Sequence, residues 1–293
     1  MQPTLIIGRY GEIGLKANIT RRFFENTLIA NIKNALKKEK ISFEIKRQRG
    51  RIYIYTDQIK KCLTILKNVF GITSFSPAVS TPSDIESMTK LALNLSKNKI
   101  SSKTSFALKV TRTGNHNYSS KDIAVILGDA IVKKTKASVN LTKPDVKLYI
   151  EIRDKQSFFF YEKLRGTGGL PLGSQGNILA FIDSKKSILA TWCVMRRGCK
   201  PIIMLSKNSM KPIVHKFLKY WYAESEIIQT KEDMTTISQN DCKAIVTGHL
   251  LSKQSLKEIQ QIKQKTQLPV LTPLVHMNQI EIKQKNKEIG LTK

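Results

Sequence analysis

Apolar residues recur with two different periods along the chain, and each period predicts a different kind of element. A short apolar run at residues 4–8 predicts a strand. Apolar side chains then recur every fourth position over residues 24–36, which predicts a helix with Thr20 as its capping residue. Alternation on both sides of Gly50 predicts a β-hairpin over residues 42–56. The beginning of the chain is therefore expected to fold as β-α-β-β.

The next segment mixes helical and alternating patterns. A capping-box spacing at Ser83 precedes an apolar helical face, and a strand over 106–110 and a helix over 122–136 follow. Residues 146–153 alternate, with apolar side chains on one side, which predicts a half-exposed strand. Its polar side carries Lys147, Tyr149, Glu151 and Arg153. A further strand is expected over 157–163.

Short apolar strands separated by helical patterns make up the rest of the chain. The predicted strands are 178–182, 201–205, 244–247 and 269–271. Strands that alternate with helices favour a parallel sheet covered by helices. In such sheets ligands bind at the carboxyl ends of the strands, and phosphate usually binds at the first strand-to-helix turn.

Glycine and proline mark the breaks between these segments. The clearest linker is the glycine-rich seam at Gly166–Gly176, and a softer break lies at residues 76–83. We therefore expect three domains, over residues 1–76, 77–170 and 171–293.

The net charge points to a polyanionic partner. The chain has 293 residues, with 50 Lys and Arg against 22 Asp and Glu, a formal charge of +28. A surplus of this size favours nucleic acid or an anionic membrane surface. No apolar run has the length of a spanning helix, and the N-terminus lacks the layout of a signal peptide, so nucleic acid is the favoured partner.

Cysteine and histidine spacing argues against metal sites and disulfides. The four cysteines, at Cys62, Cys193, Cys199 and Cys242, form no C-x-x-C pair. A reducing, cytoplasmic compartment is therefore predicted. The four histidines also lack the spacing of metal ligands, so no metal site is expected.

An ordered series of short motifs gives the chain a family resemblance. The motifs are Arg9–Lys16 (RYGEIGLK), Arg22–Glu25 (RFFE), Arg49–Ile52 (RGRI), Val69–Pro77 (VFGITSFSP), Asn140–Val146 (NLTKPDV), Gly168–Pro171 (GGLP), Met195–Gly198 (MRRG), Ala244–Gly248 (AIVTG) and Leu268–Leu274 (LPVLTPL). With these motifs the chain resembles the tRNA 4-thiouridine synthetases, which are tRNA sulfurtransferases, over essentially its whole length.

The resemblance implies a multidomain fold of α/β and α+β parts. It implies a ferredoxin-like N-terminal domain, a THUMP RNA-binding domain and a Rossmann-like, PP-loop-type parallel-sheet domain. No rhodanese-like domain is expected at the C-terminus. The residues expected to bind RNA are basic, polar or aromatic, and those of the THUMP part are Arg112, Asn115, His116, Tyr118, Lys121, Lys143, Arg153 and Lys163. Weaker candidates in the first part are Lys16, Arg21 and Arg22.

The nucleotide-binding motif of the family is altered here. In the family an S-G-G-x-D-S turn follows the first strand, and its glycines let backbone N–H groups surround the pyrophosphate of ATP. This chain has no glycine between Ile178 and Gly198. The nucleotide-binding remnant is expected at Asp183, Ser184, Lys185, Lys186, Ser187, Thr247, Gly248 and His249. Its lysines at a helix start either attract an anion or are solvated first-turn residues.

The sulfur-carrying cysteines of the family are also missing. The resemblance calls for a cysteine pair upstream of the Val-Thr-Gly strand, yet residues 200–241 contain no cysteine. Cys242 is interpreted as a buried structural thiol, because a thiolate nucleophile needs exposure and a lowered pKa. No catalytic residue is therefore assigned.

Two functions follow as alternatives. In the first, the chain is a tRNA-binding THUMP protein that serves uridine thiolation, while its own ATP-dependent adenylation is in doubt. In the second, it is an active tRNA sulfurtransferase that uses ATP and a persulfide donor. A third, weaker alternative is unspecific binding of anions.

No cofactor is assigned, with ATP and Mg²⁺ expected only if the altered turn still binds them. The expected partners are tRNA and a sulfur donor or catalytic protein, with a homodimer as an open alternative and no membrane contact.

Overall fold

The computed structural model describes the chain except for residues 1, 49, 230–241 and 292–293. The chain packs as two compact units that interleave along the sequence. The first unit consists of Met1–Arg9, Ile41–Leu63 and Ser74–Arg165. The second unit consists of Tyr10–Lys40, Thr64–Thr73 and Gly166–Lys293. Helix α2 (Ile59–Leu66) contributes residues to both units.

A mixed nine-stranded sheet forms the first unit. Its strand order is β2-β3-β1-β4-β8-β7-β5-β6, and the short β9 pairs with β4. The strands are β1 (Leu5–Arg9), β2 (Glu44–Gln48), β3 (Arg51–Tyr55), β4 (Ser74–Pro82), β5 (Ser105–Thr113), β6 (Ser138–Val139), β7 (Val146–Arg153), β8 (Gln156–Phe160) and β9 (Leu164–Arg165). The strand expected over 157–163 ends at Phe160 as β8, and residues 161–163 lie between β8 and β9.

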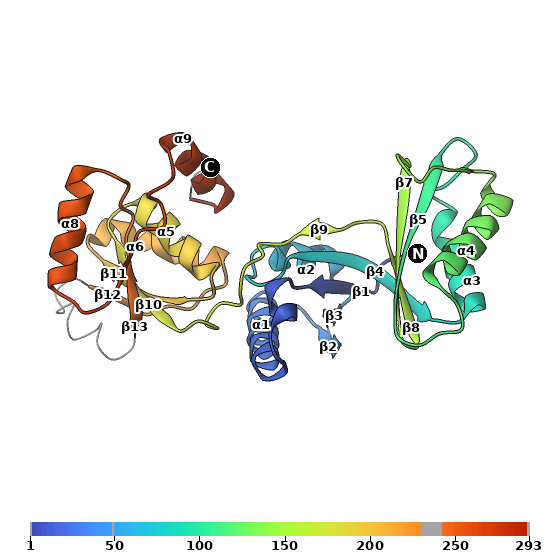
Figure 1. The fold of residues 1–293 in the computed structure, drawn as a ribbon, viewed down its shortest axis with the longest axis horizontal. Helices are drawn as coiled ribbons and strands as arrows, with labels where there is room; N and C mark the ends of the chain where they lie inside the picture. The colour runs from blue at the N-terminus through green and yellow to red at the C-terminus, as the bar shows by residue number, and fades with distance from the viewer. Residues whose placement is uncertain (1, 49, 230–241, 292–293) are drawn as a thin grey trace. The chain divides into compact units, whose positions relative to one another are not determined.

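Strand β4 is shared by the two halves of this sheet. Its residues 74–78 pair antiparallel with β1, and its residues 79–82 pair antiparallel with β8. The β1 half holds the N-terminal hairpin β2–β3, and the β8 half holds β7, β5 and β6. The long strand is visible in Figure 1, where it runs between the two halves.

Helices cover one face of the β8 half. The helices α3 (Ile85–Ser96) and α4 (Ser120–Thr135) pack on β5 and β7 through a buried apolar core (Figure 1). On β7 this core takes Leu148, Ile150 and Ile152, the side predicted to be apolar. The opposite side of β7 packs with the N-terminal strands, where Tyr53, Phe158 and Phe160 share a second apolar cluster.

A parallel five-stranded sheet forms the centre of the second unit, as the alternating pattern predicts. Its order is β12-β11-β10-β13-β14, and every described pairing is parallel. The strands are β10 (Asn177–Ile182), β11 (Lys200–Leu205), β12 (Ile227–Gln229), β13 (Cys242–Val246) and β14 (Val270–Leu271). The helical elements of this unit that the structure describes, beside the end of α2, are η1 (Glu12–Leu15), α1 (Asn18–Lys38), α5 (Lys185–Met195), η2 (Asn208–Met210), α6 (Lys211–Tyr220), α8 (Lys253–Gln264) and α9 (Gln279–Glu288). The strand order reverses between β10 and β13, which is where ligands bind in open parallel sheets.

Two helix starts differ from the sequence-based expectation. Helix α1 begins at Asn18, so Thr20 lies inside its first turn and does not cap it. The apolar periodicity marks only the buried face of the helix, and it cannot locate a first turn that has no side-chain cap. At α3 the capping residue is Asp84, whose carboxylate accepts a hydrogen bond from the Ser87 N–H at 2.8 Å. Ser83 instead donates to the carbonyl oxygen of Asp154.

The glycine-rich seam begins where the chain leaves the first unit, after Arg165, and it is closely packed within the second unit. A Cβ atom on Gly166 would lie 2.2 Å from the carbonyl oxygen of Ile72. A Cβ atom on Gly169 would lie 2.0 Å from the carbonyl oxygen of Arg196. Glycine is required at these positions because two backbones approach each other closely.

Candidate nucleic-acid interface and nucleotide turn

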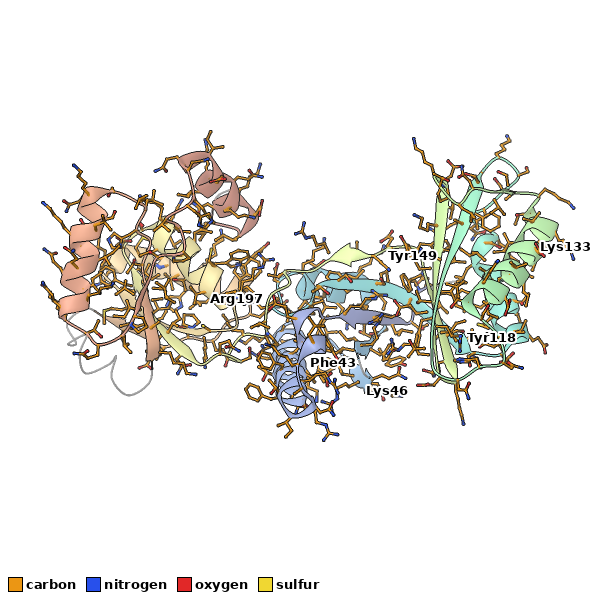
Figure 2. The ribbon with its side chains drawn as sticks, in the orientation of Figure 1. Phe43, Lys46, Tyr118, Lys133, Tyr149 and Arg197 are labelled. Atoms are coloured by element: carbon orange, nitrogen blue, oxygen red, sulfur yellow. The ribbon has the colours of Figure 1, made fainter. Side chains whose placement is uncertain are left out.

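The loop after β5 is fixed to the β7–β8 turn through His116. Nε2 of His116 lies 2.7 Å from the carbonyl oxygen of Asp154, so Nε2 carries the proton and donates. Nδ1 is then the acceptor for Nη1 of Arg112, at 3.2 Å. The Tyr118 ring lies 5.1 Å from the His116 ring, and its hydroxyl donates to the carbonyl oxygen of Ser83. Three of the side chains expected to bind RNA therefore form one connected group, in which Tyr118 is labelled in Figure 2.

The other expected RNA-binding residues of the first unit lie on its surface or at the end of a strand. Asn115, Lys121 and Lys143 are exposed, and Arg153 at the end of β7 is half-buried. Lys163 is exposed as a residue, but its Nζ lies 4.7 Å from the centre of the Tyr149 ring, within the range of a cation–π contact.

The weaker candidates of the first part belong to the second unit. Lys16 and Arg22 are exposed, and Arg21 donates to Oδ1 of Asn18 at 2.6 Å. They are therefore not part of the compact unit that holds Arg112 and His116.

A buried charge cluster in the first unit was missed by the sequence analysis. Arg9 on β1 donates from Nε and Nη2 to Oε1 of Glu151 on β7, at 3.0 and 2.7 Å. Nε of Arg51 on β3 donates to Oε2 of the same carboxylate at 2.8 Å. Glu151 is only 5% exposed, so the prediction that its side of β7 faces solvent is wrong at this position. The reason is that the N-terminal strands cover this part of the strand.

The pKa of Glu151 follows from these contacts. Burial on its own would raise the pKa of this carboxyl, but the neighbouring guanidinium groups of Arg9 and Arg51 bring it below its ordinary value. Burial lowers the pKa of Arg9, and Glu151 acts in the opposite direction. The carboxylate is therefore charged at neutral pH, and two arginines share it.

Aromatic rings lie beside this cluster. The Tyr149 and Phe160 rings stack with their centres 5.3 Å apart and their planes 6° apart. Arg9 lies over the Phe160 ring at 4.8 Å. Tyr53 stacks on Phe158 at 4.6 Å, and burial raises the pKa of Tyr53 to about 12. The alternation of β7 placed Tyr149 and Glu151 on one face, which is the signal that the sequence offered.

In the second unit, the turn between β10 and α5 is closed by a side chain. The Ser187 hydroxyl accepts hydrogen bonds from the backbone N–H groups of Asp183 and Ser184, both at 3.1 Å, and donates to the carbonyl oxygen of Ser184 at 2.7 Å. Ser187 is 1% exposed, whereas Lys185 and Lys186 are exposed. Two backbone donors of the expected phosphate turn are thus already satisfied within the chain.

The end of β13 lies against this turn. A Cβ atom on Gly248 would come within 2.5 Å of the backbone nitrogen of Ser187. Nδ1 of His249 lies 2.8 Å from Oγ1 of the buried Thr247, and its Nε2 lies 2.8 Å from Oε2 of Glu258 on α8. The expected nucleotide residues after β10 and after β13 are therefore brought together at the switch point of the sheet, with His249 held between two partners.

Comparison with protein families matches three consecutive segments of the chain. Residues 5–76 match the ThiI ferredoxin-like domain, residues 82–161 match the THUMP domain, and residues 202–293 match the family described as thiamine biosynthesis protein (ThiI). A probable tRNA sulfurtransferase of Methanobrevibacter smithii is 33% identical, over 99% of this chain and 87% of the relative. The chain belongs to the tRNA sulfurtransferase family. Another probable tRNA sulfurtransferase, from Methanocaldococcus jannaschii, is 32% identical over 97% of this chain and 87% of its own.

Two solved structures resemble this member of the tRNA sulfurtransferase family over its length. One is PH1313 from Pyrococcus horikoshii, with a TM-score of 0.85 and 26% identity, covering 98% of this chain and 99% of its own. The other is a 4-thiouridine synthetase–RNA complex with bound ATP, with a TM-score of 0.80 and 25% identity, covering 99% of this chain and 85% of its own. They confirm the multidomain fold that the motifs imply.

The match to the family is uneven around the nucleotide turn. The ThiI match begins at Ile202 in β11, so β10 and the β10–α5 turn lie outside it. The alignment with the M. smithii relative spans 337 positions, more than the 293 residues of the chain, so that tRNA sulfurtransferase has segments for which this chain has no residue.

Cys62, Cys193 and Cys199 of this tRNA sulfurtransferase family member are free thiols that are buried or partly buried. Burial raises the pKa of Cys62 to about 12, and it also raises the pKa of Cys193 and Cys199. Cys242 is the first residue of β13 and is 8% exposed. Within the described parts of the chain, no helix is long and apolar enough to cross a membrane.

Proposed function

We propose that this chain binds tRNA through its first unit and serves the thiolation of a tRNA uridine. Membership of the tRNA sulfurtransferase family supports this, as does the match of residues 82–161 to the THUMP domain. The residues of the first unit carry 23 basic and 10 acidic side chains, an excess that suits a phosphate backbone. A 4-thiouridine synthetase of the same fold was solved with RNA, and we extend RNA binding to this chain by that likeness.

The RNA site that we propose lies around the Arg112–His116–Tyr118 group. Its side chains are held by hydrogen bonds to backbone carbonyl groups of Gly114, Asp154 and Ser83, so RNA would meet a preformed surface. The remaining proposed contacts are Asn115, Lys121, Lys143, Arg153 and Lys163, with Lys16, Arg21 and Arg22 as secondary ones. Basic side chains would engage phosphates, while the shape of the RNA would decide which molecule binds.

We infer further that the β10–α5 turn does not hold ATP in the PP-loop manner. The observation that carries this inference is the Ser187 hydroxyl, which occupies the N–H groups of Asp183 and Ser184. Gly248 also packs directly on the turn, where a phosphate would have to approach. The residues of this turn do not fit a pyrophosphate, and charge on the exposed Lys185 and Lys186 gives only a screened contact.

The alternative is an active tRNA sulfurtransferase that uses ATP, Mg²⁺ and a persulfide sulfur donor. One observation favours it: the turn and Thr247–His249 meet at the strand-order reversal, the usual ligand position in such sheets. The thiols argue for the first proposal, because burial raises the pKa of Cys193 and Cys199 and so disfavours the thiolate. Under the first proposal, a sulfur donor or a catalytic partner protein completes the reaction.

Calorimetric titration of the full chain with Mg-ATP distinguishes the two functions. We expect no binding tighter than millimolar, and no thiouridine when the purified chain is incubated with tRNA, ATP and a persulfide donor. Micromolar binding of ATP that is lost in Ser187→Ala or Lys186→Ala would establish the alternative. The other sequence-based predictions, a cytoplasmic location and a homodimer as an open alternative, are checked by cell fractionation and by light scattering of the purified chain.

A further inference from the structure

The contacts of Arg51 leave one edge of its guanidinium open. Nε donates to Oε2 of Glu151 at 2.8 Å, and Nη1 donates to the carbonyl oxygen of Gly50 at 2.7 Å. The remaining N–H groups of Arg51 make no hydrogen bond to any residue that the structure describes. The side chain is 24% exposed, so the fixed guanidinium plane still has access to solvent.

The charge around Arg51 is not balanced. Glu151 is the carboxylate of the cluster, and Arg9 already binds it through two N–H groups. Arg51 is therefore a second cation on a carboxylate that is already paired. The pKa of Lys163 reflects this excess of positive charge. Burial lowers this pKa, the charges of Arg9, Arg51 and Lys109 lower it further, and the charge of Glu151 raises it. A partly buried excess of positive charge raises the free energy of the unit, and a bound anion would lower it.

The position of Lys163 is also set by its surroundings. Its ammonium lies 4.7 Å from the centre of the Tyr149 ring and 6.0 Å from that of Phe160, two rings that stack on each other. Tyr149, labelled in Figure 2, comes from β7, the same strand as Glu151. The ring pair thus holds the ammonium near the cluster without neutralising it.

We propose that Arg51 and Lys163 form a preorganised site for a phosphate of the RNA backbone, with Glu151 and Arg9 as positioning residues. An open guanidinium edge presents parallel N–H groups, which match two oxygens of one phosphate. A purely structural ion pair would need only one arginine to neutralise the Glu151 carboxylate. Arg51 and Lys163 are two further cations that such an ion pair does not require. The proposal rests on the proposed tRNA binding, which it deepens by naming a site apart from the Arg112–His116–Tyr118 group.

Fluorescence anisotropy with a fluorescein-labelled tRNA transcript, at a series of salt concentrations, tests the site in the full chain. Each phosphate contact contributes about one to the slope of log Kd against log salt. We expect Arg51→Ala to lower this slope by about one, and we expect Arg51→Lys to keep the slope but to bind more weakly than wild type. The matched control is Lys133→Ala, which removes one charge from the outer side of α4, on the opposite face of the sheet (Figure 2).

Glu151→Gln separates positioning from charge. This change adds one positive charge to the chain, so electrostatic attraction alone would tighten the binding of tRNA. We expect weaker binding, because Arg51 loses the carboxylate that fixes its guanidinium plane. Circular dichroism at the assay temperature establishes that the variant is folded, and Arg51→Lys, which keeps the charge but not the fork, provides a second test in which Glu151 is intact.

The outcomes distinguish this site from the proposed function. If wild type binds no tRNA, the proposed function fails and this site fails with it. If wild type binds tRNA with a steep salt dependence but Arg51→Ala changes the slope no more than Lys133→Ala does, only this proposal is overturned. Tighter binding by Glu151→Gln overturns the positioning role of Glu151, and wild-type affinity in Arg51→Lys overturns the contact of the guanidinium with two phosphate oxygens.

Discussion

Gly248 lies directly against the backbone of Ser187, close enough that a Cβ atom on Gly248 would come within 2.5 Å of the Ser187 nitrogen. The contact joins the end of β13 to the first turn of α5 in the second unit. Glycine is required here because a Cβ atom has no space. Backbone conformation is not the reason, because Gly248 does not have a positive φ.

We therefore expect Gly248→Ala to destabilise the second unit. Overpacking against backbone atoms that cannot move aside costs about 1–3 kcal/mol. Urea denaturation followed by tryptophan fluorescence measures this change, because Trp192 and Trp221 both lie in the core of the unit. The matched control is Gly14→Ala in η1 of the same unit, where a Cβ would meet only the Tyr10 ring at an ordinary distance of 4.0 Å. That variant should be as stable as wild type or gain up to about 1 kcal/mol. Equal stability of the two variants would contradict the close contact.

The Ser187 hydroxyl is expected to be needed for stability. In Ser187→Ala the N–H groups of Asp183 and Ser184 lose their acceptor, and the loss of such partly buried hydrogen bonds costs about 0.5–1.5 kcal/mol each. Thermal unfolding of the second unit should shift to lower temperature accordingly. Ser209→Ala is a suitable comparison, because Ser209 is an exposed serine of the same unit. A Ser187→Ala variant as stable as Ser209→Ala would show that water replaces the Ser187 hydroxyl without cost.

Binding of tRNA is expected to depend steeply on salt. If roughly six to ten phosphates are contacted, affinity should fall by about 10³–10⁵ between 50 and 200 mM salt. Filter binding with labelled tRNA measures this dependence, and a DNA duplex of similar charge at matched salt tests for specificity. Constant affinity across the range would argue against the proposed interface, and equal affinity for the duplex would favour unspecific binding of anions.

Cys193, Cys199 and Cys242 are expected to be dispensable for sulfur transfer. Burial raises the pKa of Cys193 and Cys199, which keeps them as thiols at neutral pH, and Cys242 is buried at the start of β13. Each Ser variant, expressed in cells that depend on this chain, should leave the thiouridine content of tRNA unchanged. Loss of thiouridine in one variant that still folds and binds tRNA would identify that thiol as a sulfur carrier.

The stability of the first unit is expected to fall in acid partly because of Glu151. Its carboxyl has a lowered pKa in the folded chain: burial acts to raise it, but Arg9 and Arg51 outweigh burial. A lowered folded pKa gives stabilisation that is present above the ordinary Glu pKa and lost as the pH falls. Between roughly pH 5 and 3, the loss of stability should be shallower in Glu151→Gln than in wild type. Glu162→Gln, at an exposed position, should keep the wild-type dependence.

Periodicity was enough to predict most of the secondary structure. The parallel sheet of the second unit could be predicted from short apolar runs separated by helical patterns. A strand that is buried on both faces is a continuous apolar run in the sequence. The division of β4 between two neighbours was not predictable, since a continuous strand has the same pattern whether it has one partner or two. The motifs supplied the ferredoxin-like and THUMP parts, which periodicity alone does not distinguish.

The candidate sites were predicted in part, and the reason is distance along the chain. The group around His116 is local and polar, so its loop could be found by composition. Arg9 and Glu151 are 142 positions apart, and alternation along β7 shows which residues share a face but not what covers it. The missing glycines of the nucleotide turn were visible in the sequence. That the Ser187 side chain closes the turn was not, because a serine at that position is equally able to face solvent.

Because β4 pairs with β1 through residues 74–78 and with β8 through residues 79–82, the chain cannot be cut at residue 76 or 77 without dividing a strand. A fragment ending there would leave the beginning of β1 without its β4 partners. A fragment beginning there would leave the rest of β4 as an unpaired edge strand beside β8. A one-residue insertion at Ala78 would reverse the alternation of the following residues and turn their inward side chains outward. The ferredoxin-like and THUMP parts thus share a single strand. The side-chain alternation of β4 in one part therefore fixes which side chains face inward in the other.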